Sequence, residues 1–119
     1  MQYALLIYAD ETLEATTPKE EQDAVMAEYY AYTQAITASG AYKGGEALHP
    51  TSAASTVRVR DGKTLTTHGP FAETKEQLGG FYLVECKNLD EAIEWAAKIP
   101  GARYGCVEVR PVVDFSQAQ

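Results

Sequence analysis

The sequence predicts an α+β fold in which helices cover one face of an antiparallel β-sheet. Three observations lead to it: short apolar runs typical of strands, two longer segments with helical apolar spacing, and an Asp-Gly pair between two alternating segments. In chain order they give strand, helix, strand, hairpin, strand, helix, strand. Without the hairpin this is βαββαβ, the order of the ferredoxin-like fold.

The first half contains one continuous apolar strand and one long helix. Residues 3–9 are apolar throughout, which is typical of a strand covered on both faces. The helix is predicted to start at Thr17-Pro18-Lys19-Glu20, with Thr17 as N-cap and Glu20 completing a capping box, and to end at Ser39-Gly40. Its apolar stripe, which Met26 and Ala35 widen, is Val25, Tyr29, Tyr32 and Ile36.

The middle of the chain contains a strand and a hairpin. Residues 41–48 are predicted to form a strand in which Gly44-Gly45 indicate a bulge or a close backbone approach. Residues 56–60 and 63–67 flank Asp61-Gly62, which predicts a type I′ turn. Arg58 and Arg60 are expected to face solvent.

The last third repeats the strand and helix pattern. Residues 80–87 form a strand, Asn88 caps a second helix, and residues 105–110 form the final strand. Gly79-Gly80 are expected to be a permissive point before the strand. The buried stripe of the second helix is predicted to be Ala92, Ile93, Ala96 and Ile99.

Length and composition indicate one globular domain, residues 1–114, followed by a frayed tail at 115–119. The net charge of −7 and the absence of a basic cluster argue against direct nucleic-acid binding. The apolar run near the N-terminus is too short for a membrane span and lacks the basic flank of a signal peptide. A cytoplasmic protein with two buried, unpaired thiols, Cys86 and Cys106, is therefore expected.

Two helices cover only one face of the predicted sheet, so the other face is left with exposed apolar side chains. A monomer rarely exposes such a surface. A second copy stacked face to face would bury it. The sequence therefore predicts a homodimer, a dimeric α+β barrel, with a hollow between sheet and loops.

Several segments together resemble the DGPF proteins, a branch of the YCII-related domain family. The strongest match is Gly69-Pro70-Phe71-Ala72-Glu73-Thr74-Lys75-Glu76. Further matches, in order along nearly the whole chain, are Leu5-Leu6-Ile7-Tyr8, Gly45-Glu46-Ala47-Leu48, Thr56-Val57-Arg58, Gln77-Leu78-Gly79-Gly80-Phe81-Tyr82 and Val107-Glu108-Val109-Arg110-Pro111. His68 stands where the family motif has Asp.

The resemblance implies a dimeric α+β barrel and leaves the activity open. Most DGPF proteins have no assigned reaction, many are encoded beside extracytoplasmic-function sigma factors, and some relatives look like enzymes that use a His-Asp pair on ring compounds. The helix-1 histidine of those enzyme-like relatives has no counterpart here.

The loop after the hairpin is the main candidate site. Gly69-Pro70 turn the chain sharply, and an extended backbone would place Glu73 and Lys75 on one side. Lys75 would then neutralise a carboxylate or enolate and Glu73 would orient it. A solvated loop, or an exposed ion pair worth about 0–1 kcal/mol, is the alternative for these residues.

Other candidates are residues that can move protons or line a pocket. Glu46, between Gly45 and Ala47, would act as a base if buried, and His68 titrates near neutral pH. Tyr8, His49 and Tyr82 are candidate ligand contacts, although turn or core positions explain them equally well. Glu108 and Arg110 are expected to pair structurally. No cofactor motif is present, and no metal site is predicted.

Two functions remain open. The first is a homodimeric protein that binds a small anionic or ring compound, as a lyase- or isomerase-like enzyme with Glu46, His68, Glu73 and Lys75 in acid/base roles. The second is a non-catalytic accessory or regulatory module that contacts a protein partner near sigma-factor-linked transcription.

Overall fold

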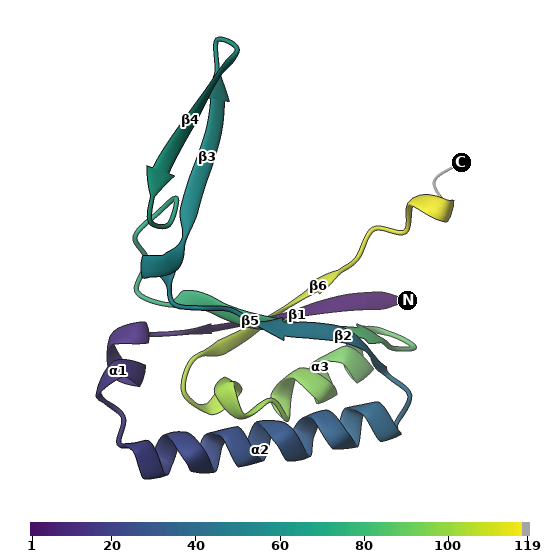
Figure 1. The fold of residues 1–119 in the computed structure, drawn as a ribbon. Helices are drawn as coiled ribbons and strands as arrows, with labels where there is room; N and C mark the ends of the chain where they lie inside the picture. Colours follow the sequence, from purple (N-terminus) through teal and green to yellow (C-terminus); the bar gives the residue numbers. More distant parts are fainter. Residues whose placement is uncertain (118–119) are drawn as a thin grey trace.

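A computed structural model describes residues 1–117 and contains a four-stranded antiparallel sheet with strand order β2-β5-β1-β6 (Figure 1). Its strands are β1 (Gln2–Ala9), β2 (Tyr42–Ala47), β5 (Gln77–Glu85) and β6 (Cys106–Pro111). Helices α2 (Lys19–Ala38) and α3 (Leu89–Ala97) lie on one face of this sheet. The predicted ferredoxin-like βαββαβ order is confirmed.

Shorter elements complete the chain. A hairpin of β3 (Ser55–Arg60) and β4 (Lys63–His68) forms a separate two-stranded sheet. The others are helix α1 (Glu11–Thr16) and the 3-10 turns η1 (Thr51–Ala53), η2 (Pro100–Arg103) and η3 (Phe115–Gln117). The frayed tail predicted for 115–119 thus begins with a 3-10 turn, and its residues 118–119 lie outside the described part.

The core lies between the sheet and its two helices. The largest fully buried side chains, one or two from each layer, are Leu5, Ile36, Val84 and Ile99. The predicted stripe of α2 is confirmed at Tyr32 and Ile36, but Met26 is 66% exposed and does not widen it. In α3, Ala92 and Ala96 are buried as predicted, whereas Ile93 is exposed.

The start of α2 differs from the predicted capping box. An additional helix, α1, begins at Asp10, whose carboxylate accepts a hydrogen bond from Thr12 N at 2.9 Å. Thr17 ends α1, and its hydroxyl donates to Leu13 O at 2.9 Å instead of capping α2. The first residue of α2 is therefore Lys19, and no side chain caps it.

Strand β5 starts earlier than residue 80. Gln77 pairs with Ala9, and a register shift separates Ile7 from Tyr8, so Gly79-Gly80 lie inside the strand rather than before it. The bulge predicted in β2 is confirmed by a register shift between Tyr42 and Gly44. Gly79 has no partner on β1, so the glycine pair marks the position inside β5 where the register shifts.

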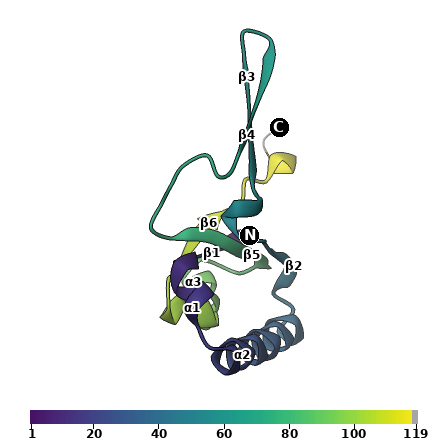
Figure 2. The same ribbon diagram turned by 60° about the vertical axis from the view of Figure 1, so that its left-hand side comes forward.

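Local turn and cap signals are confirmed where they depend on adjacent residues. Asp61 and Gly62 both have positive φ, 52° and 74°, as a type I′ turn requires. The Asn88 side chain accepts from Glu91 N at 3.0 Å and caps α3. The hairpin stands away from the main sheet, on the side opposite α2 and α3 (Figures 1 and 2).

The sheet face opposite the helices is uncovered within this chain. Opposite residues in adjacent strands share a face, so the pairings of Leu6 with Phe81 and of Ala4 with Leu83 put these four side chains together. All four are only half-buried. The exposed apolar sheet face predicted from the sequence is present.

The two cysteines lie in different environments. Cys86 is buried as predicted, but Cys106 is exposed, so the prediction of two buried thiols is wrong for Cys106. Cys106 starts β6 and pairs with Tyr8 on the uncovered face. Partial desolvation by neighbouring atoms, and then the nearby Glu76 carboxylate, raise the pKa of the Cys106 thiol.

Tyr32 makes the folded state sensitive to high pH. Burial, and then Tyr82 beside it, raise the pKa of its phenol, whose hydroxyl donates to Trp95 O at 2.9 Å. Above about pH 10 an unfolded chain releases this proton while the folded chain keeps it, so stability should fall as pH rises. We expect Tyr32→Phe to cost about 1 kcal/mol at neutral pH and to lose less stability than the wild type on going to high pH. Urea unfolding of the wild type and of Tyr32→Phe at neutral and at high pH measures the two changes in stability. An equal loss of stability in both proteins would contradict the role of Tyr32.

Candidate functional site

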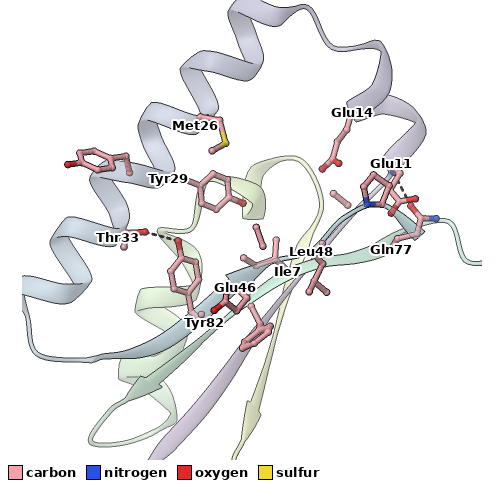
Figure 3. A pocket seen from close by; sticks show the side chains of 18 of the residues that line it. Ile7, Glu11, Glu14, Met26, Tyr29, Thr33, Glu46, Leu48, Gln77 and Tyr82 are labelled. Atoms are coloured by element: carbon pink, nitrogen blue, oxygen red, sulfur yellow. Dashed lines mark hydrogen bonds between the residues drawn. The ribbon is translucent and has the colours of Figure 1, made fainter. Parts of the chain in front are cut away.

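A cavity of about 550 Å³ lies between α2 and the part of the sheet formed by β2 and β5 (Figure 3). Met26 and Thr33 of α2 line one side, and Ile7 and Leu48 belong to the opposite wall. The tyrosines in its lining come from both layers and are Tyr29, Tyr30, Tyr42 and Tyr82. Long aromatic side chains hold helix and strand apart here, which leaves space between them.

Hydrogen bonds fix two of the lining tyrosines. The hydroxyls of Tyr82 and Thr33 are 2.9 Å apart (Figure 3), and Tyr29 accepts from Gly101 N at 3.1 Å. Tyr82 also meets the rings of Tyr32 and Tyr42 edge to face, at centroid distances of 5.2 and 6.1 Å. The ring that crosses the cavity is thereby held in one orientation.

Helix α1 brings carboxylates to one end of the cavity. The Glu11 carboxylate accepts from Thr51 N at 2.8 Å and from the Thr51 hydroxyl at 2.7 Å, and Gln77 Oε1 accepts from Glu11 N at 2.9 Å. Glu14 lies one turn further along α1 and also lines the cavity. Partial burial, and then the Glu11 and Asp10 carboxylates, raise the pKa of Glu14.

The charge of the lining is one-sided. Among the residues that the structure describes, the lining includes three carboxylates, Glu11, Glu14 and Glu46, and no lysine, arginine or histidine. A negatively charged ligand would meet repulsion with no compensating cation. Aromatic walls with a carboxylate end suit a neutral or positively charged ring compound.

Two residues proposed from the sequence, Glu46 and Tyr82, line this cavity. Glu46 lies on the edge strand β2 and pairs with Phe81, so its side chain leaves the sheet on the face away from α2. Tyr82 pairs with Leu5 and faces the helices. Glu46 is exposed and therefore sits at the open edge of the cavity.

Tyr8 lies on the uncovered sheet face instead. Its hydroxyl donates to Glu108 Oε1 at 3.2 Å, and Arg110 donates to both Glu108 oxygens at 2.9 Å. The ion pair between Glu108 and Arg110 agrees with the structural role expected for it. Burial, followed by the hydrogen bond to Glu108, raises the pKa of the Tyr8 phenol.

The loop residues lie outside the cavity lining. His49 and His68 are exposed, the latter at the end of β4 opposite Ser55. Glu73 lines a smaller hollow of about 340 Å³ together with Thr51 and Gln77. Within residues 1–117, no ion pair joins Glu73 to Lys75.

Gln77 connects this loop to the cavity. It lines both hollows, accepts from Glu11 N, and donates to Thr74 O. Sequence reasoning missed Glu11, Glu14 and Gln77. The signal for the first two was Asp10 followed by acids one and four residues later, the usual start of a short helix.

Metal ligands do not gather in the described part of the chain: no group of three or more His, Cys, Asp or Glu side chains is placed to hold an ion. No helix in residues 1–117 is long and apolar enough to cross a membrane. The polar side chains in the cavity lining are tyrosines, Thr33, Gln77 and the carboxylates of Glu11, Glu14 and Glu46.

Fold and cavity together define a ferredoxin-like α+β domain with an added β-hairpin. The chain belongs to the YCII-related domain family, whose family model matches residues 1–116. It is also 43% identical over 121 residues to the uncharacterized protein R00369 of Rhizobium meliloti (strain 1021), a match that covers 100% of this chain and 98% of the relative. The family resemblance read from the sequence is confirmed.

Proposed function

We propose that the protein is a homodimer that binds a small ring compound, neutral or positively charged, in the cavity beneath α2. The observation that carries this proposal is the tyrosine-lined cavity with carboxylates at its end. Its volume of about 550 Å³ falls in the usual range for ligand pockets, roughly 300–1,000 Å³.

Acid/base chemistry in this cavity would use carboxyl groups. The raised pKa of Glu14 keeps this carboxyl protonated to higher pH than an ordinary glutamic acid, so it can donate a proton to a bound ring. Glu46 is exposed and its side chain leaves the sheet on the face away from α2, so it is the candidate base only for a ring that reaches the open edge of the cavity. Such a pair supports a proton-transfer reaction of the lyase or isomerase type.

The uncovered sheet face supports the dimer. Leu6, Phe81 and Leu83 are half-buried in a single chain and would become buried beneath a second copy. Glu46 leaves the sheet on that same face, so its side chain would lie at the contact with a second copy.

Thermal unfolding with three phenols of different charge tests the binding site. Tyramine and phenol should stabilise the protein more than 4-hydroxyphenylacetate, because the lining is acidic; a probe at 100 times its Kd would add about 2.7 kcal/mol. Thr33→Phe should abolish the effect, since it fills the space beside Tyr82. Thr37→Phe, one turn further along α2 and exposed, is the matched control and should keep it.

Lys75→Met separates this cavity from the loop site. Lys75 does not line the cavity, so the variant should bind tyramine as the wild type does. Loss of binding in Lys75→Met, together with normal binding in Thr33→Phe, would move the site to the loop and refute the proposal.

A further inference from the structure

The β3–β4 hairpin is an arm with two chemically different faces. Its register pairs Val57 with Thr66 and Val59 with Thr64 on one face, which carries no charged side chain. The other face pairs Arg58 with Leu65 and Arg60 with Lys63, and is basic. Both faces are exposed, and Val57 and Val59 are each 59% exposed.

An arm of this kind is unstable by itself. A two-stranded hairpin is at best marginally stable in water, and independent stability needs a third strand or packing against another element. Only the base of the arm is anchored in the described chain: Gly69 N donates to Ala54 O at 2.7 Å and the Thr56 hydroxyl donates to Gly69 O at 2.8 Å. Two exposed valine–threonine pairs, Val57 with Thr66 and Val59 with Thr64, and the exposed Leu65 beyond the base therefore imply a partner surface.

The charges indicate what that surface is. Residues 55–68 carry three basic and one acidic side chain, whereas the rest of the chain carries seven basic and sixteen acidic ones. The acidic body of a second copy is thus complementary to the basic arm. Exposed acids on the helix layer include Glu20, Glu21 and Asp23 at the start of α2.

The direction and the length of the arm fit a second copy of the chain as its partner. The arm rises from the uncovered side of the sheet, where a second copy would stack (Figures 1 and 2). Six residues per strand span about 20 Å, whereas stacked sheets lie about 10 Å apart. The arm is long enough to pass the sheet of a second copy and bring its basic tip to the helix layer behind it.

We propose that the arm clasps a second copy of this chain, with the Val57 and Val59 face against the edge of that copy and Arg58, Arg60 and Lys63 on its acidic surface. This inference rests on the homodimer of the proposed function. It adds that the arm, and not the sheet face alone, holds the two copies together.

Sedimentation equilibrium of the full chain tests the clasp. Arg58→Glu/Arg60→Glu and Val57→Thr/Val59→Thr should each raise the dimer Kd about tenfold or more, a cost of about 1.4 kcal/mol. At 1 M salt, where the screening length is about 3 Å, the increase in dimer Kd caused by Arg58→Glu/Arg60→Glu should fade. The increase caused by Val57→Thr/Val59→Thr should persist. Threonine keeps the β-branched shape, so the strands remain favourable.

Two controls match these changes. Lys87→Glu/Lys98→Glu alters the net charge equally at exposed sites that flank α3, and Val113→Thr makes the same substitution at another exposed valine. Both should leave the dimer Kd unchanged. A wild type that stays monomeric would refute the homodimer and the clasp together. A dimer unaffected by the arm variants would refute the clasp alone, as would binding of duplex DNA that only Arg58→Glu/Arg60→Glu abolishes.

Discussion

Gly105→Ala is expected to lower the free energy of unfolding by about 3 kcal/mol, the upper range for forcing extra volume into a packed site. A methyl group at Gly105 would lie 2.0 Å from Tyr8 O and 3.0 Å from Ala9 Cα. Both are backbone atoms of β1, which is hydrogen-bonded on both sides. The strand cannot move away without losing pairing at Tyr8 and Cys106.

Gly44→Ala is the matched control for this substitution. No atom lies within 4 Å of a methyl group placed at Gly44, and its φ is not positive. Urea unfolding of both variants should show a change within about 0.5 kcal/mol for Gly44→Ala. Equal losses in the two variants would mean that the close approach of Gly105 to β1 does not determine stability.

Leu5→Ala should cost about 2–5 kcal/mol, the range for truncating a fully buried leucine. Leu5 is 0% exposed and lies at the centre of the sheet, between Tyr82 on β5 and Val109 on β6. Removing its side chain leaves a cavity that two hydrogen-bonded neighbouring strands cannot close. Because Leu5 lies beside Tyr82, the variant should also weaken tyramine binding.

Leu13→Ala controls for the loss of the same atoms at the surface. Leu13 is 64% exposed on α1, and alanine is the better helix former, so unfolding should change by about 0.5 kcal/mol or less. A large loss in Leu13→Ala would show that α1 is packed against something outside this chain.

Sequence reasoning succeeded where neighbouring residues decide the structure. The Asp61-Gly62 turn needs only two residues that accept positive φ, and the Asn88 cap needs only a side chain three positions from Glu91. Sequence reasoning failed at Thr17, although Thr17-Pro18-Lys19-Glu20 has the pattern of a good capping box. Asp10 caps an earlier helix, and Thr17 then ends that helix through its bond to Leu13.

The site was only partly predictable for the same reason. Tyr82 was identified as one of the tyrosines in strand-like runs that could line a pocket, and its pairing with Leu5 places it on the helix-covered face. Glu11 and Gln77 were not, because their roles depend on contacts with Thr51 and Thr74, which are brought to them by the path of the loops. Glu73 and Lys75 are two positions apart in the motif, yet of the two only Glu73 lines a hollow.

The sequence alone determined the order of strands and helices, the hairpin turn, the core stripe at Tyr32 and Ile36, and membership of the family. These depend on side-chain period and local backbone preference, which act over a few residues. The tertiary structure decided the register of β5, the position of α1 and the residues that enclose the cavity. Those depend on contacts between residues tens of positions apart, which exist only after the layers have packed.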